Sequence, residues 1–236
     1  MILTQVNRWR AAAIVALLLS CKPAASASGT GASSGVRTDT TAARPVAAAP
    51  DSNITRADLA RIQGNPNAPL WVIEVSDFQC PYCKQWHEQT YAVFRDEFVK
   101  TGKIRLAYVN FPLNSHRYAW PSAESAMCAG AQGKFWEMHD ALFSTQQRWE
   151  SMPSPGILFD SLARSTGVDM PRWRDCVSSG KMKSLIQADH DRAAKAGAEA
   201  TPSFMIGDQI LAGAQPIDVL RRAVDSALVK TKKTTP

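Results

Sequence analysis

Two cysteines separated by two residues, Cys80 and Cys83, are the side chains of this chain best suited to chemistry. They lie in the stretch SDFQCPYCKQW, residues 76–86. Two thiols at this spacing can bind a metal, brace a turn, or form a disulfide that is made and broken. Which of the three applies depends on the elements around the pair and on a Thr201-Pro202 step much later in the chain.

The residues on either side of the pair predict a strand, a helix and a second strand. LWVIEV, residues 70–75, is a nearly continuous apolar run rich in β-branched residues, which is typical of a strand covered on both faces. Residues 84–100 carry large apolar side chains at helical spacing, and Gly102 ends that pattern. KIRLAYVNF, residues 103–111, predicts the next strand. The cysteines therefore lie at the strand-to-helix turn of a βαβ unit.

The rest of the chain is predicted to be mostly helical, with a return to strands near the end. Residues 115–197 show apolar residues three or four apart, punctuated by Gly and Pro. PSFMIGDQILAG, residues 202–213, predicts a hairpin with a tight turn at Gly207-Asp208. A last amphipathic helix is expected over about residues 216–229.

A cysteine at the start of a helix faces unpaired backbone N–H groups and the positive end of the helix dipole, and both favour a thiolate. Pro81 suits the first helical position. We therefore expect Cys80 to be an exposed thiol whose pKa is lowered to within about 3.5–7.5, and Cys83 to be a more buried resolving partner. This arrangement favours a redox disulfide over an inert staple. Zinc is disfavoured because no second pair of ligands has short spacing, so neither a metal nor another cofactor is expected.

Four segments resemble the DsbA-like thiol:disulfide oxidoreductases of the bacterial envelope. EVSDFQCPYC is similar to the family's strand and active-site turn, TPSFMIGDQILAG to its proline hairpin, and FPLNSH and GKFWEMHDALF to its insertion. The resemblance implies an α/β thioredoxin fold, with an α+β sheet core and a helical-bundle insertion. Its expected parts are a first half over residues 54–114, the insertion over 115–197, a second half over 198–230, and a tail over 231–236.

The resemblance also assigns roles around the cysteines. Glu74 is expected to be buried beneath Cys83 and to move its proton, with a raised pKa caused by burial. Pro202 is expected to be cis and to pack opposite the pair, which leaves the backbone of Thr201 to bind an extended substrate. Pro81 and Tyr82 form the active-site turn. The alternatives are a solvated Glu74 at the strand edge and an ordinary trans Pro202.

Some members of this family carry a second, structural disulfide in the insertion, and the resemblance implies one between Cys128 and Cys176. The alternative is a second redox pair, but these cysteines lack a CxxC spacing and a proline at a helix start.

The four histidines are not assigned to the site. We expect His87 to face solvent, His116 to cap or pack, and His139 and His190 to lie on helix surfaces.

The N-terminal residues predict export. Arg8 and Arg10 precede an apolar stretch, residues 11–19, that is too short to span a bilayer. LLSC, which ends at Cys21, resembles a lipobox and predicts lipidation of that cysteine; the alternative is cleavage after ASA, residues 25–27. Residues 22–53, rich in Ala, Ser, Gly, Thr and Pro, predict a disordered tether. The even number of remaining cysteines favours disulfides in an exported chain.

Together these features predict a monomeric dithiol oxidase of the periplasm or envelope. Nucleic acid is not expected as a partner, since no basic stripe with interleaved aromatics occurs. Its partners would be exported proteins with free thiols and a DsbB-like or VKOR-like redox protein of the inner membrane. The alternatives are a disulfide isomerase or reductase of the same fold, and a non-catalytic binding lipoprotein of the envelope.

Overall fold

The computed structural model describes residues 51–234. The predicted signal segment, Cys21 and most of the predicted tether lie outside these residues. The first described helix, α1 (Ser52–Ala60), begins where the tether was expected to end, because the Asp51 side chain caps it by accepting a hydrogen bond from the Asn53 backbone N–H. Among the described residues, no helix is both long enough and apolar enough to cross a membrane.

A five-stranded mixed sheet forms the frame, in the order β1-β3-β2-β4-β5. Its strands are β1 (Ile62–Gln63), β2 (Leu70–Ser76), β3 (Ile104–Asn110), β4 (Ser203–Ile206) and β5 (Gln209–Ala212). The central strands β2 and β3 are parallel, and the other pairs are antiparallel. Both predicted strands and the hairpin are present, whereas the short edge strand β1 was not predicted.

A continuous helical segment follows β2 and connects it to β3. It comprises α2 (Pro81–Trp86), η1 (His87–Tyr91), α3 (Ala92–Phe94) and η2 (Arg95–Val99), where the two η elements are π-helical. Its apolar side packs on one face of the sheet with the C-terminal helix α10 (Ile217–Thr234), around a core that includes Trp86, Phe94 and Leu220. α10 extends past the predicted end near residue 229 because no Gly or Pro interrupts it before Thr234.

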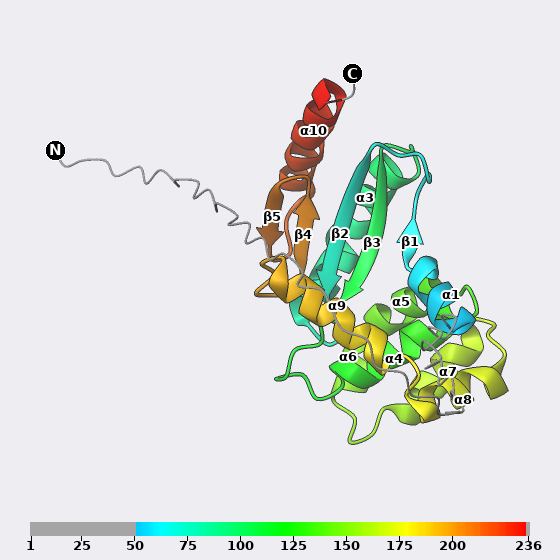
Figure 1. Ribbon diagram of the computed structural model, residues 1–236. Coiled ribbons are helices and arrows are strands. Elements are labelled where there is room, and N and C mark those ends of the chain that lie inside the picture. Colours follow the sequence, from blue (N-terminus) through cyan, green and yellow to red (C-terminus); the bar gives the residue numbers. More distant parts are fainter. Residues whose placement is uncertain (1–50, 235–236) are drawn as a thin grey trace, which may run out of the picture. The chain divides into compact units, whose positions relative to one another are not determined.

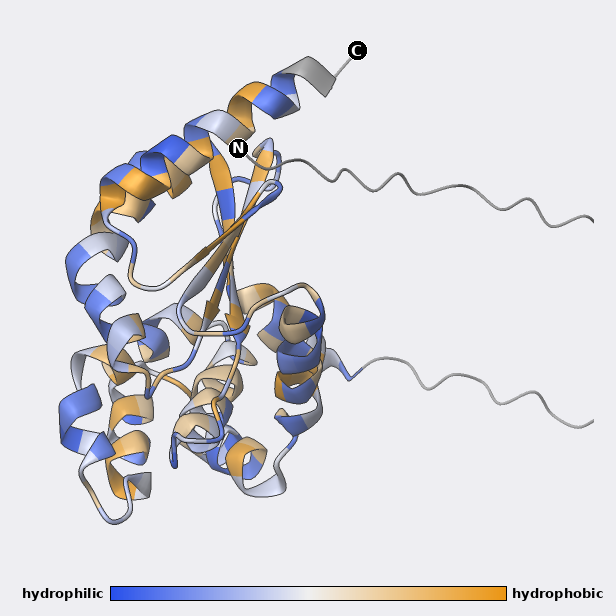
Figure 2. Cartoon of the chain, turned by 90° about the vertical axis from the view of Figure 1, so that its left-hand side faces the viewer, coloured by the Kyte–Doolittle hydropathy of each residue, from blue (hydrophilic) through white to orange (hydrophobic). Residues whose placement is uncertain are grey.

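Six helices form the insertion between β3 and β4. They are α4 (Ala119–Gly130), α5 (Phe135–Ser144), α6 (Gln146–Glu150), α7 (Gly156–Ser165), α8 (Met170–Ser179) and α9 (Lys183–Lys195). In Figure 1, β2 and β3 run toward the group formed by α4 to α8, so the C-terminal ends of these strands meet the insertion. Figure 2 shows that the strands are largely hydrophobic, whereas the helices carry both hydrophobic and hydrophilic residues. The thioredoxin fold with a helical insertion is thus confirmed.

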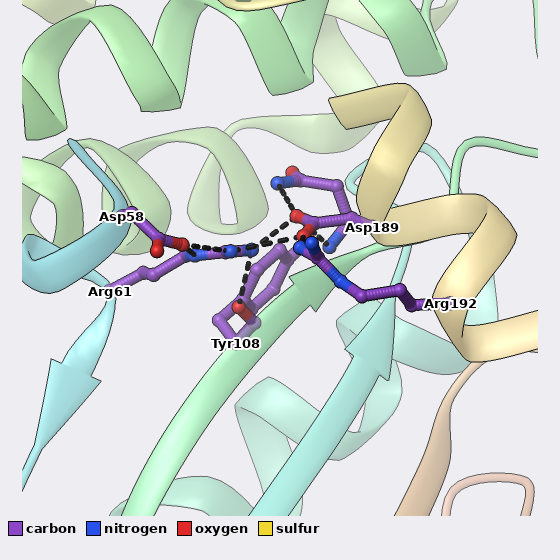
Figure 3. Close-up of polar contacts among 6 residues, drawn as sticks. Asp58, Arg61, Tyr108, Asp189 and Arg192 are labelled. Atoms are coloured by element: carbon purple, nitrogen blue, oxygen red, sulfur yellow. Dashed lines mark hydrogen bonds and ion pairs between the residues drawn. The ribbon is translucent and has the colours of Figure 1, made fainter. Parts of the chain in front are cut away.

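A buried ion pair joins the start of the domain to the end of the insertion. Arg61, which follows α1, binds the carboxylate of Asp189 in α9 and donates a hydrogen bond to the Tyr108 carbonyl at 3.2 Å. Asp189 also accepts hydrogen bonds from the Asn110 side chain at 3.0 Å and from Arg192 at 2.7 Å (Figure 3). Because Asp189 is fully buried, these partners replace the water that its charge would otherwise bind.

Candidate active site

Cys80 lies at the junction between the sheet and the insertion, as the N-cap residue of α2. β2 ends at Ser76, and the Cys80 backbone N–H donates a hydrogen bond to the Asp77 carbonyl at 3.0 Å, which closes the turn. Pro81 occupies the first helical position, where its missing N–H leaves no partner unsatisfied. The predicted strand, turn and helix therefore place Cys80 at a helix entrance.

The sequence prediction of an exposed Cys80 is wrong. Only 3% of this residue is exposed, and its Sγ donates a hydrogen bond to the Thr201 carbonyl oxygen at 3.3 Å. The cause is the loop before β4, which covers the thiol. Tyr82, in contrast, is 61% exposed and marks the accessible side of the turn.

The pKa of Cys80 is lowered to about 6. The hydrogen bond from the Cys83 thiol is the largest cause; burial opposes it, and the Thr201 side chain and the backbone N–H groups of Cys83 and Tyr82 add to the lowering. The helix entrance thus contributes, but less than the second thiol does. At neutral pH most of Cys80 is thiolate, the form that acts as nucleophile and leaving group.

Cys83 is fully buried one turn into α2, and its pKa is raised well above its usual value, first by burial and then by its interactions with Cys80. Both cysteines are free thiols in this structure. Cys80 therefore ionises readily, as a nucleophile must, whereas Cys83 keeps its proton until a base removes it, as expected of a resolving thiol.

Glu74 is fully buried in β2, and burial raises its pKa to about 8. Ser76, two residues after Glu74 in β2 and so on the same face of the strand, lowers the pKa of both the Glu74 carboxyl and the Cys83 thiol. Neither carboxyl oxygen of Glu74 forms a hydrogen bond within the described residues. A carboxyl group of this kind is protonated near neutral pH and can exchange a proton with a neighbouring thiol.

The raised pKa of Glu74 makes the free energy of unfolding depend on pH. The folded chain keeps this proton up to about pH 8, whereas the unfolded chain loses it near 4.5. Between these values the folded state binds the extra proton, so its stability falls as the pH rises, by up to about 1.4 kcal/mol per pH unit. In urea unfolding of the reduced protein, Glu74→Gln is expected to remove this fall. Equal pH slopes for wild type and variant would contradict it.

The other half of the site is the step between Thr201 and Pro202, whose peptide bond is cis. Thr201 is buried beside Cys80, and the Pro202 carbonyl accepts a hydrogen bond from the Gly213 N–H at 2.7 Å, which ties the step to the hairpin. The structure thus brings together Cys80, Cys83 and Thr201-Pro202, which are far apart in the sequence.

Three side chains that the sequence analysis did not assign to the site hold the cysteine turn in place. Asp77, which directly follows β2, accepts hydrogen bonds from the backbone N–H groups of Gln79 at 2.8 Å and Leu113 at 2.9 Å. Its other contact is with His116 Nδ1 at 2.7 Å, and this hydrogen bond raises the pKa of His116. From α6, Gln146 donates to the Cys80 carbonyl at 3.0 Å. The insertion therefore positions the turn directly.

Cys128 in α4 and Cys176 in α8 are joined by a disulfide that closes a separation of 48 residues. Cys128 is 1% exposed and Cys176 is 7% exposed, which leaves little surface for a partner thiol. We assign the bond a structural role.

Replacing both Cys128 and Cys176 by alanine is expected to lower the free energy of unfolding by about 2–4 kcal/mol, because the unfolded chain regains the freedom that the bond removes. Urea unfolding measures this loss, and dithiol oxidation by Cys80 should continue below the new melting temperature. Loss of oxidation in the folded double variant would instead indicate a redox role for the second pair.

Two of the histidine predictions are wrong. His139 is not on a helix surface but fully buried, since it follows Phe135 by one helical turn on the apolar side of α5. His87 does not face solvent: its side chain is 14% exposed, and its ring stacks on Phe143. His116 packs on Asp77, as described above, and His190 stacks on Phe111 with ring centroids 4.5 Å apart.

Among the described residues, one group of side chains could hold a metal ion: His87, His139 and Asp140, whose ligand atoms lie within 4.8 Å of one another. Cys80 and Cys83 do not belong to it. Both histidines already contact one oxygen of Asp140, at 3.1 Å from His87 and 2.8 Å from His139. The contacts with Asp140 satisfy one nitrogen of each ring without an ion.

Comparison with known proteins gives a family and a fold. The family model described as Thioredoxin matches residues 57–226. A curated relative, the Na(+)/H(+) antiporter NhaA 1 of Salinispora arenicola, is 32% identical over 74% of this chain but only 26% of its own length. The chain thus spans about a quarter of the first curated relatives. Disulfide bond formation protein D of Bacillus subtilis is 24% identical over 71% of this chain and 76% of its own.

Two solved structures have similar folds. The oxidised form of BdbD from Bacillus subtilis has a TM-score of 0.66 at 22% identity, over 72% of this chain and 92% of that one. The α-DsbA1 protein of Wolbachia pipientis has a TM-score of 0.66 at 21% identity, over 75% of this chain and 94% of that one.

Proposed function

Because the chain belongs to the thioredoxin family, we propose that it is a DsbA-like thiol:disulfide oxidoreductase that oxidises dithiols in exported proteins. The observation that carries the proposal is the pairing of Cys80, which caps the entrance of α2 and has a pKa lowered to about 6, with a buried Cys83 that retains its proton. The name of the Bacillus subtilis relative, disulfide bond formation protein D, supports the same activity.

The reaction begins with the Cys80–Cys83 disulfide. A substrate thiolate attacks Cys80 Sγ, the bond between the two cysteines breaks, and its electron pair leaves on Cys83 Sγ. Because the pKa of Cys83 is high, that sulfur takes a proton, and Glu74 is the nearby acid. The substrate is then joined to Cys80 in a mixed disulfide, while its chain pairs with the backbone of Thr201.

A second substrate thiolate then attacks the substrate sulfur of the mixed disulfide. Cys80 leaves as a thiolate, the substrate gains a disulfide, and the enzyme retains the two electrons as a dithiol. Since the lowered pKa of Cys80 stabilises this reduced form, the enzyme disulfide should be a strong oxidant. The thiol at Cys80 must first be uncovered, and an incoming strand that displaces its contact with Thr201 would do so.

Direct oxidation of a reduced, unfolded model protein tests the proposal. The oxidised enzyme should introduce disulfides stoichiometrically and become reduced. Its reduction potential should lie closer to the oxidising end of the thioredoxin-fold proteins, about −120 mV, than to the value of thioredoxin, about −270 mV. A potential near the thioredoxin value would identify a reductase. Rescue of scrambled disulfides without net oxidation would identify an isomerase. A protein that shows none of these activities would be a binding protein.

We further propose a place in the bacterial envelope, with Cys21 lipidated and the predicted tether between it and α1. Reoxidation would then require a membrane protein of the DsbB-like or VKOR-like class, which accepts electrons from the dithiol. Metabolic labelling with a fatty acid tests the anchor: wild type should carry the label and Cys21→Ala should not. A labelled Cys21→Ala variant would overturn the assignment of that cysteine.

A further inference from the structure

Three side chains outside the cysteine site combine the ligand types of a metal centre: His87 in η1, and His139 and Asp140 in α5. One ligand atom from each lies within 4.8 Å of the other two. Imidazole rings favour ions such as zinc, copper and nickel, and a carboxylate oxygen often completes their coordination. The disulfide exchange described above does not use any of these three side chains.

The spacing of the ligand atoms is close to that around a bound ion. His87 Nε2 lies 3.1 Å from Asp140 Oδ1, and His139 Nδ1 lies 2.8 Å from the same oxygen. Ligand atoms of a tetrahedral zinc ion, each about 2.0–2.2 Å from the metal, are about 3.3–3.6 Å apart. Small rotations of the three side chains would therefore place all three atoms around one ion.

The contacts with Asp140 leave the lone pair of each imidazole ring unused. An ionised carboxylate only accepts hydrogen bonds, so a ring that donates to Asp140 has its lone pair on the other nitrogen. That nitrogen is Nδ1 in His87 and Nε2 in His139, and both atoms are buried without a hydrogen-bond partner among the described residues. In the opposite tautomer both lone pairs face Asp140, and a cation between the three side chains would bind all of them.

The group is open to solvent on one side, so an ion can enter it. His139 is fully buried, but the Asp140 side chain is 47% exposed. His87 and Asp140 also line a surface cavity of about 360 Å³. Because the chain supplies three ligands, a fourth coordination position would face this cavity, as in zinc sites that keep one position open.

The charges around the group suit a divalent ion together with a small anion. Two neutral rings and one carboxylate carry a single negative charge, so a divalent ion leaves a net positive charge. Arg95 in η2 lines the same cavity, where its guanidinium carbon lies 5.4 Å from the centre of the Tyr91 ring. Hydroxide or another small anion is therefore better suited to the open position than a cationic group would be.

We propose that His87, His139 and Asp140 bind a divalent transition-metal ion such as Zn²⁺, and that this ion joins the helix of the cysteine turn to the insertion. η1 continues from α2, which begins directly after Cys80, whereas α5 belongs to the insertion. Ligands from both sides of one ion would hold these two parts together. His87 and Asp140 are 53 residues apart, so the sequence shows no short metal-binding spacing. The ion would bind whether or not the cysteines exchange disulfides.

Cobalt binding to the oxidised protein tests the site, because Co²⁺ in a tetrahedral site absorbs visible light and Zn²⁺ does not. The full chain is used with Cys80 and Cys83 joined as a disulfide and with any free thiol alkylated. We expect one Co²⁺ ion to bind per chain, with visible absorption bands that disappear when Zn²⁺ displaces it. Zn²⁺ at about 100 times its dissociation constant should raise the melting temperature by about 5–10 °C.

Two variants assign the ion to these side chains. Asp140→Asn and His87→Gln each retain a polar side chain but remove a ligand. Either change should weaken Zn²⁺ binding by at least about 100-fold, the upper end of the loss caused by removing a residue that only supports a metal ligand. Glu137→Gln is the matched control, since Glu137 lies in the same helix and its side chain is also 47% exposed. This variant should bind Zn²⁺ as the wild type does.

Three results would overturn the proposal. They are the absence of visible Co²⁺ bands in the oxidised wild type, wild-type affinity for Zn²⁺ in Asp140→Asn, and binding by the reduced protein alone, which would place the ion on the cysteines. The wild-type spectrum decides the matter even if a variant fails to fold.

Discussion

Replacing Cys80 by serine is expected to abolish dithiol oxidation, with a loss of at least about 10³-fold, since removal of an attacking nucleophile leaves only background reaction. The reason is specific to the sulfur: it must be ionised near pH 7 and must be able to form a disulfide, and a serine hydroxyl does neither. The rate of oxidation of a reduced model protein measures the effect.

Cys83→Ala gives a different expected result, which separates the two thiols. Cys80 of this variant can still attack a disulfide, but no second thiol can resolve the product. A stable mixed disulfide on Cys80 should therefore accumulate and be visible by mass spectrometry. The Cys128→Ala/Cys176→Ala variant is the control and should retain oxidation.

Activity of Cys80→Ser near the wild-type level would show that this CxxC pair is not the reaction centre.

Loss of the Asp189 carboxylate should strongly destabilise the folded chain. Asp189→Ala leaves the charge of Arg61 buried without a partner and removes an acceptor from Asn110 (Figure 3). Breaking a buried pair in this way costs about 3–5 kcal/mol. For a domain of this size that is a fall in melting temperature of about 6–20 °C, which differential scanning calorimetry measures.

Arg192→Ala is the matched control for this prediction. Arg192 binds the same carboxylate, but its side chain is 64% exposed, so its removal should cost less than about 1 kcal/mol. Replacing Arg61 and Asp189 together by methionine and leucine should be less damaging than Asp189→Leu alone, because no unpaired charge remains. If Asp189→Ala lowers the free energy of unfolding by less than about 1 kcal/mol, the pair does not hold the insertion on the sheet.

The fold and the reacting residues could be predicted because their signals are local. An apolar strand, a proline after the first cysteine and a helical pattern fixed the place of Cys80 and Cys83, and a single Thr-Pro step marked the other half of the site. The edge strand β1 has two residues, too few for any periodic pattern. The π-helical turns after Trp86 have no signal in the sequence because an α-helix would have nearly the same pattern of buried residues.

The contacts that support the site could not be predicted, because they join residues that are distant in the sequence. Arg61 and Asp189 are 128 residues apart in the sequence, and Gln146 is 66 residues from Cys80, whose carbonyl it binds. The burial of Cys80 depends on Thr201 in the same way. His139 is different: its position one turn after Phe135 and three residues before Leu142 placed it on the apolar face of its helix, and that signal was present in the sequence.

The central claim is that the site keeps Cys80 ionised at neutral pH while Cys83 remains protonated. Titration of the reduced protein, followed through the ultraviolet absorbance of the thiolate and through the rate of Cys80 alkylation, tests it most directly. We expect one thiolate to form with an apparent pKa of about 6 and Cys83 to stay protonated well past its usual range. A single ionisation near 9, the ordinary value for a cysteine, would contradict the account.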